Sequence, residues 1–87
     1  MQVIYKYPLK VERKQVVQMP LGAIILSAQF QGDVLCIWAR VDTDKPAVNR
    51  LIHVYGTGHE MESHIHRYIA TAQMLSTGLV FHVFEEQ

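Results

Sequence analysis

Hydrophobic and polar residues alternate with a period of two along most of the chain, and this pattern predicts β-strands. VIYKY at 3–7 alternates in this way and is followed by Pro8, which cannot donate a hydrogen bond within a sheet. KQVVQM at 14–19 is a weaker candidate, ended by Pro20 and Gly22.

The segment AIILSAQF-QGD-VLCIWARV, residues 23–41, contains two β-rich runs on either side of a connection with Gly32. This pattern predicts a β-hairpin. One face of the first arm is expected to carry Ile24, Leu26, Ala28 and Phe30, and one face of the second arm Leu35, Ile37, Ala39 and Val41. Because the opposite faces also carry apolar residues, we expect this hairpin to be central in the fold.

Turn-forming residues separate the later strands. DTDKPAVN at 42–49 combines aspartates, a proline and an asparagine, which is typical of a loop. RLIHVYG at 50–56 and RYIATAQM at 67–74 alternate again as strands. LVFHVFEE at 79–86 predicts the last strand, and residues 85–87 are expected to form a solvated tail.

These elements predict a mostly β protein, a small antiparallel β-sandwich or barrel of about six to seven short strands with at most one short helix. A helical turn fits at 59–67 or 67–75. At 87 residues the chain holds one hydrophobic core, so we expect a single domain over residues 1–87. The expected core contains Ile24, Leu26, Leu35, Ile37, Leu51, Val54, Ile69, Leu79, Phe81 and Val83.

The composition favours a protein that binds another protein. Apolar residues make up 49% of the chain and charged residues 18%, whereas an average globular domain has about 25% charged residues. Because so small a body cannot easily bury this apolar surplus, we expect a homodimer or a partner-binding face. Lys plus Arg and Asp plus Glu each number 8, and this balance argues against direct nucleic-acid binding, which needs a basic stripe.

Cysteine usage and hydropathy point to the cytoplasm. Cys36 is the only cysteine, which excludes an intrachain disulfide and fits a reducing compartment. The N-terminus MQVIYKYPLK lacks the apolar run of a signal peptide. The longest strongly apolar stretch, residues 23–26, is too short to cross a bilayer, so no membrane association is expected.

The stretch YGTGHEMESHIHRY at 55–68 contains three of the five histidines. His64 and His66 are two positions apart and would face the same side of an extended strand, so they could share a metal ion with His59 and Glu62. However, this spacing matches no established zinc signature. A solvent-exposed loop can also contain several histidines and glutamates with little loss of stability. The sequence therefore favours a loop without a metal or other cofactor, with these four residues as the alternative.

The turn Gly56-Thr57-Gly58 offers a second candidate site. Its backbone N–H groups could hold a phosphate or carboxylate, which would make Tyr55, Gly56, Thr57, Gly58 and His59 ligand-binding residues. The Lys-Ser or Lys-Thr of a phosphate loop does not follow this turn. Glycines that let the chain leave a strand explain the same pattern more simply.

The sequence predicts no enzyme activity. Cys36 lies inside an apolar strand, where a thiol usually serves as inert packing. Ser63 and His64 are neighbours in sequence, whereas a catalytic triad is recognised by its spatial geometry. His53 and His82 lie within strands, where we expect them to be hydrogen-bonded or edge-facing.

The ordered segments VIYKYPL, QMPLGAIILSAQFQ, LCIWARVDTD, VYGTGH, YIATAQM and LVFHVFEE resemble a family of small uncharacterised proteins, a domain of unknown function, encoded by bacteriophages and prophage regions of bacterial genomes. The resemblance covers nearly the whole chain. It implies an accessory protein in the cytoplasm of the bacterial host and transfers no catalytic motif. By analogy, small phage proteins of this kind often bind a host protein or complex, as anti-CRISPR inhibitors bind CRISPR-Cas components.

The sequence supports two hypotheses for the function. The first is a non-enzymatic β-domain that binds a host macromolecule, for example a component of a bacterial defence system. The second is a small-ligand or metal-binding module that uses the loop at 55–66.

Overall fold

The computed structural model describes residues 1–62 and 66–87, and all regular secondary structure in this part of the chain is β. The strands are β1 (Gln2–Pro8), β2 (Lys14–Pro20), β3 (Ile24–Gln31), β4 (Val34–Asp42), β5 (Ala47–Gly56), β6 (His66–Gln73) and β7 (Val80–Glu86). The predicted small antiparallel sandwich is confirmed. Strand β6 and a turn occupy 67–75, where a helical turn was considered.

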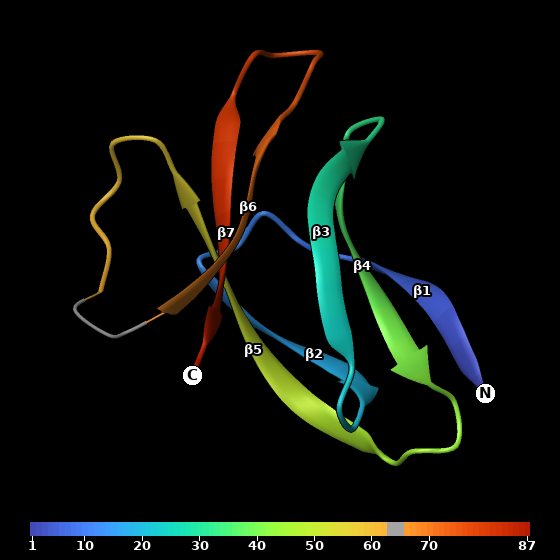
Figure 1. Cartoon of the computed structure of the whole chain (residues 1–87). Coiled ribbons are helices and arrows are strands. Elements are labelled where there is room, and N and C mark those ends of the chain that lie inside the picture. The colour runs from blue at the N-terminus through green and yellow to red at the C-terminus, as the bar shows by residue number, and fades with distance from the viewer. Residues whose placement is uncertain (63–65) are drawn as a thin grey trace.

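The strands form two antiparallel sheets, one in the order β1-β4-β3 and one in the order β2-β5-β7-β6. Figure 1 shows β6 and β7 of the four-stranded sheet on one side and β3, β4 and β1 on the other, and strand β3 packs against strand β6. The principal extents of 39 × 31 × 16 Å describe a flattened body. Its thickness fits two sheets stacked about 10 Å apart.

The predicted hairpin is formed by β3 and β4, whose turn contains Gly32 in the left-handed region at φ +61°. A residue without a Cβ adopts this conformation at no steric cost. The predicted inner face of the second arm is confirmed, because Leu35, Ile37, Ala39 and Val41 are all buried.

The face predicted for the first arm is wrong in its first half. A β-bulge between Ile25 and Ser27 inserts one extra residue, which shifts the alternation that the sequence pattern assumes. As a result, Ile25 packs against the core, whereas Ile24 and Leu26 are 48% and 51% exposed. Beyond the bulge, Ala28 is buried as expected.

A second bulge, between Tyr68 and Ala70 in β6, has the same effect. Strict alternation over 67–74 would place these two residues on one face, but Ala70 is buried in the core and Tyr68 is 57% exposed. Tyr68 instead contacts Phe84 edge-on, with ring centroids 5.5 Å apart.

The core lies between the sheets and consists of Leu9, Met19, Ala23, Ala28, Leu35, Ile37, Ala39, Val41, Ile52, Val54, Ala70, Ala72 and Val83. Ile69 and Phe81, which were also predicted, pack against this cluster from partly buried positions. Leu79 precedes β7 and is 54% exposed, which corrects its assignment to the core. Leu51 is only half-buried, because its neighbour Ile52 takes the inward position on β5.

The predicted solvated tail at residues 85–87 is also wrong, because strand β7 continues to Glu86. Glu85 pairs with Ile52 of β5 and, like that residue, is buried. Successive residues of a strand point to opposite faces, so Glu86 lies on the outer face of the same sheet, where it is half-buried. Of the three residues 85–87, only Gln87 is exposed.

Candidate functional site

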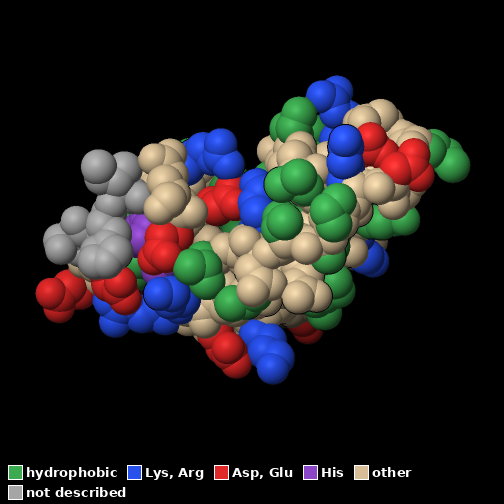
Figure 2. Space-filling model, turned by 90° about the horizontal axis from the view of Figure 1, so that it is seen from below, with side chains coloured by type: hydrophobic (Ala, Val, Ile, Leu, Met, Phe, Trp, Pro, Cys, Tyr) green, Lys and Arg blue, Asp and Glu red, His purple; other side chains and the backbone are tan. Residues whose placement is uncertain are grey.

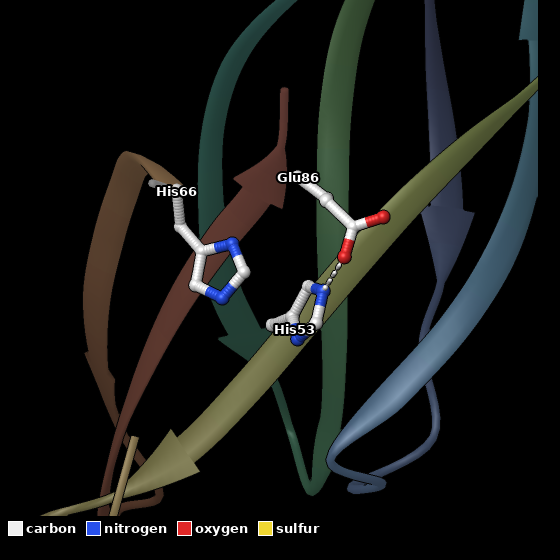
Figure 3. A group of neighbouring side chains, drawn as sticks. All are labelled: His53, His66 and Glu86. Atoms are coloured by element: carbon white, nitrogen blue, oxygen red, sulfur yellow. Dashed lines mark hydrogen bonds and ion pairs between the residues drawn. The ribbon is translucent and has the colours of Figure 1, made fainter. Parts of the chain in front are cut away.

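Three side chains from adjacent strands, His53 on β5, His66 on β6 and Glu86 on β7, meet on the outer face of the four-stranded sheet (Figure 3). One nitrogen or oxygen atom from each lies within 4.8 Å of the others. The strand register explains this meeting, because Glu86 pairs with His66 and Phe84 pairs with His53. Alternation then places His53, Phe84 and Glu86 on one face, with His66 beside them.

His53 has no exposed surface, although it points away from the core between the sheets. Aromatic rings surround it: the His66 ring centroid lies at 4.1 Å and the Tyr55 ring centroid at 6.0 Å. Tyr55 is 3% exposed and lies under the Arg13 guanidinium, whose central carbon is 5.9 Å from the ring centroid. The His53 and Tyr55 side chains therefore lie in a water-poor environment, where charge interactions are stronger than in bulk water.

The Tyr55 hydroxyl bridges the two imidazoles. Its oxygen lies 3.3 Å from Nδ1 of His53 and 3.3 Å from Nε2 of His66. The other nitrogen of His53, Nε2, lies 3.2 Å from Oε1 of Glu86, and the Lys14 ammonium lies 3.7 Å from the same oxygen. These contacts fix the orientation of both rings, and they confirm that His53 is hydrogen-bonded within its strand.

A second charged cluster lies on the opposite face of the same strands. Arg50 donates two hydrogen bonds to the Glu85 carboxylate and one to the Ala23 carbonyl, and Arg67 donates a further one to Glu85 at 2.5 Å. Burial alone raises the pKa of Glu85, but the hydrogen bonds from the two arginines outweigh it and hold this pKa below its usual value. The Glu85 hydrogen bond raises the pKa of Arg50. This cluster ties the end of the four-stranded sheet to the start of β3.

The five residues predicted to bind a small ligand surround one hollow. Tyr55, Gly56, Thr57, Gly58 and His59 line it together with Met61, His82 and Phe84, and its volume is about 260 Å³. A neighbouring pocket of about 330 Å³ adds the 11–13 segment and shares Tyr55, Gly56 and His59. Ligand binding by these residues stays a prediction.

Gly56 has a packing role in this loop. The His59 ring lies against it so closely that a Cβ at Gly56 would be 2.8 Å from Cε1 of His59. The His59 N–H also donates to the Gly56 carbonyl at 3.1 Å, and Gly58 between them has φ +87°. Gly58 therefore turns the chain through a positive φ, as the simpler interpretation of the GTG turn predicts, whereas Gly56 provides the space for the His59 ring.

The residues proposed as alternative metal ligands are placed differently from one another. His64 lies outside the described residues. Glu62 pairs loosely with Arg13, at 4.0 Å from its Nε, and His59 packs on Gly56. Within the described part of the chain, His66 is grouped with His53 and Glu86 instead.

His82 occupies the middle of the same outer face. Its Nε2 lies 2.8 Å from the Thr57 hydroxyl and its Nδ1 lies 3.0 Å from the Thr71 hydroxyl. The Tyr68 hydroxyl bonds the Thr71 hydroxyl at 2.9 Å and extends this chain. His82, which lies in β7, is thus hydrogen-bonded, as predicted. Its two partners lie on other segments, so it connects the GTG turn to β6.

Sequence reasoning did not find His53 and Glu86 as partners of His66. Period-two alternation places His53 and Tyr55 on one face of β5 and His82, Phe84 and Glu86 on one face of β7. Such faces can be derived from the sequence. The order of strands in the sheet, which makes these faces adjacent, cannot.

The described residues include no helix of the length and apolarity needed to span a bilayer. No curated protein and no solved structure is significantly similar to the chain. The whole chain, residues 1–87, matches the family described as Domain of unknown function (DUF7352). The protein therefore belongs to this family.

Proposed function

We propose that the protein is a non-enzymatic accessory protein of a phage or prophage, which binds a host macromolecule through the outer face of its three-stranded sheet. The observation that carries this proposal is a row of exposed apolar residues across that sheet. Ile4 of β1 and Ile24 of β3 both pair with Arg40 of β4, and they are 61% and 48% exposed. Leu26, in the β3 bulge, is 51% exposed.

The neighbouring row extends this face. Lys6 and Ser27 both pair with Trp38, which is partly exposed. Aromatic residues and arginine are enriched at the centres of protein interfaces, and this face combines Trp38, Arg40 and aliphatic side chains. Figure 2, which views the molecule from below, shows hydrophobic side chains exposed among charged ones, mostly on the half of the molecule away from the visible histidine surface.

The proposed target is a protein or protein complex in the bacterial cytoplasm, such as a CRISPR-Cas or other defence component. The phage resemblance supplies this setting, and the equal numbers of acidic and basic residues favour a protein over a nucleic acid. A second copy of the chain is the competing occupant of the same face, since a homodimer would bury Ile4 and Ile24 as well.

Affinity purification of the tagged protein from a host with active defence systems tests the proposal. Ile24→Glu places a charge in the proposed face, and Leu75→Glu is the matched control, because Leu75 is 87% exposed in the turn between β6 and β7. We expect the wild type and the control to capture the same stoichiometric complex and Ile24→Glu to lose it. Light scattering of the purified protein separates a dimer from a monomer.

Two results would count against this function. The first is a monomer that captures nothing from the host, and the second is a complex that Ile24→Glu leaves intact. In either case the ligand-binding hypothesis gains, because its five predicted residues surround one hollow. Thermal shift with a nucleotide panel, compared between wild type and His59→Ala, then tests that hypothesis.

A further inference from the structure

We propose that His53, His66 and Glu86 form a binding site for one divalent transition-metal ion, Zn²⁺ in particular, with Tyr55 as the residue that positions both imidazoles. This inference is independent of the macromolecule-binding face, which lies on the other sheet. It also differs from the set His59, Glu62, His64 and His66 that the sequence suggested.

The donor atoms and their spacing suit a zinc ion. Two imidazoles and one carboxylate are ligands that Zn²⁺ prefers, and three protein ligands with one open position are typical of non-structural zinc sites. Zinc–ligand bonds of about 2.0–2.1 Å in a tetrahedral site place neighbouring ligand atoms roughly 3.3 Å apart. His53 Nε2 and Glu86 Oε1 already have nearly this separation, at 3.2 Å. Because one ligand atom of each residue lies within 4.8 Å of the others, shifts of about an ångström would complete the set.

Tyr55 holds both imidazoles in the orientation that a metal ion needs. Metal-bound histidines usually donate the N–H of their other nitrogen to an outer partner, which fixes the ring and its tautomer. The Tyr55 oxygen contacts Nδ1 of His53 and Nε2 of His66, both at 3.3 Å. One phenol oxygen can accept from both rings, and this arrangement assigns Nε2 of His53 and Nδ1 of His66 to the ion.

The three residues lie on a hydrogen-bonded sheet that holds them in place. The three ligands come from hydrogen-bonded neighbours in one sheet rather than from a single loop. His53 is fully buried and Tyr55 nearly so. Their side chains therefore lose little conformational freedom when a metal ion binds. Sites on rigid elements hold their ligands more exactly than sites on loops.

Lys14 provides the competing explanation. Its ammonium lies 3.7 Å from Glu86, so the cluster could be a purely structural ion-pair network. The two explanations predict different effects of Lys14→Gln, and only a metal site predicts a gain in metal affinity. Removing a positive charge beside a cation site strengthens metal binding, whereas in an ion-pair network the same change only weakens the contacts of Glu86. Lys14 is 49% exposed, so its side chain can turn to solvent when a cation binds.

Titration of the chelator-treated full chain with Co²⁺ and Zn²⁺ tests the site directly. We expect one ion per chain, visible absorption typical of four-coordinate Co²⁺, and displacement of Co²⁺ by Zn²⁺. Glu86→Gln and His66→Gln should weaken binding more than about 100-fold, and Tyr55→Phe about tenfold with unchanged stoichiometry. Lys14→Gln should tighten it. Nitrogen-15 shifts of the histidines should report coordination by Nε2 of His53 and Nδ1 of His66.

His82→Gln and His59→Gln serve as matched controls, because both change a histidine of the same region outside the proposed set. Both should bind the ion like the wild type, and circular dichroism should confirm that every variant folds. Glu86→Gln keeps the shape of the side chain, so it remains informative even if His66→Gln does not fold.

Several results would overturn the proposal. These are the absence of saturable binding at millimolar metal, binding that survives Glu86→Gln, binding that is lost with His59→Gln or His64→Gln, and weaker binding in Lys14→Gln.

Discussion

The buried ion-pair cluster at Glu85 yields the sharpest prediction for stability. Glu85 is 5% exposed and accepts hydrogen bonds from both Arg50 and Arg67. Replacing it by Gln keeps the volume and one acceptor oxygen but removes the negative charge. The Arg50 side chain, 15% exposed, is then left with a charge that no carboxylate compensates.

The expected cost follows from the kind of interaction lost. Removing one partner of a buried ion pair costs about 3–5 kcal/mol. Arg50 keeps its bond to the Ala23 carbonyl, and Gln can still accept one hydrogen bond, so we expect about 2–4 kcal/mol for Glu85→Gln. Arg67→Gln should cost less than about 1 kcal/mol, because the Arg67 side chain is 59% exposed and solvent screens its charge.

The pH dependence gives an independent check. The pKa of Glu85 is lowered in the folded state, so its contribution to stability is present above the unfolded value, about 4.3. That contribution is lost as the pH falls through the folded pKa. The difference between wild type and Glu85→Gln should therefore be full at pH 7 and shrink as the pH is lowered through this range.

Urea unfolding followed by the fluorescence of Trp38, the only tryptophan, measures these differences. With an m-value of about 1 kcal/mol/M, the midpoint of Glu85→Gln should fall by roughly 2–4 M at pH 7. Glu12→Gln is the control, since Glu12 is exposed. The reasoning is refuted if Glu85→Gln changes stability by less than about 0.5 kcal/mol at pH 7, or if its effect is the same in acid.

Three further predictions concern the core and the turns. Ile37→Ala should cost about 2–5 kcal/mol, because Ile37 is fully buried, whereas Leu75→Ala should stay within about 0.5 kcal/mol; calorimetry of both tests the assignment of the core. Gly32→Ala should cost about 1 kcal/mol or more, because it strains the turn at φ +61° although the space around Gly32 is open; equilibrium unfolding measures this cost. Gly56→Ala should displace the His59 ring and alter the NMR signals of His59, and His59→Ala should relieve the strain that Gly56→Ala causes. If the effects of the two substitutions on the free energy of unfolding are simply additive in a double-mutant cycle, this contact is contradicted.

The sequence determined the local features of this protein. Alternation, prolines and glycines located the strands, including the hairpin at 23–41, although β5 begins at Ala47, inside the loop predicted at 42–49. The sequence also showed that Tyr55 and the GTG turn lie together, since neighbours in a short loop stay neighbours in space. These inferences succeed because a strand's period and a turn's chemistry depend on residues within a few positions of one another.

Only the tertiary structure decided which faces meet. The bulges at Leu26 and Ile69 shift the alternation, so Ile24 and Tyr68 turn outward. A bulge depends on how two strands pair, and no local sequence pattern predicted either of these two bulges.

The same reason explains the two clusters at the end of β7. Local sequence makes Glu85 and Glu86 a polar pair at the end of the chain. The order β5-β7-β6 gives Glu85 two arginines on the inner face and brings Glu86 to His53 and His66 on the outer face. Contacts between residues far apart in the sequence, such as Arg50 with Glu85 and His53 with Glu86, depend on sheet order, which local propensities do not encode.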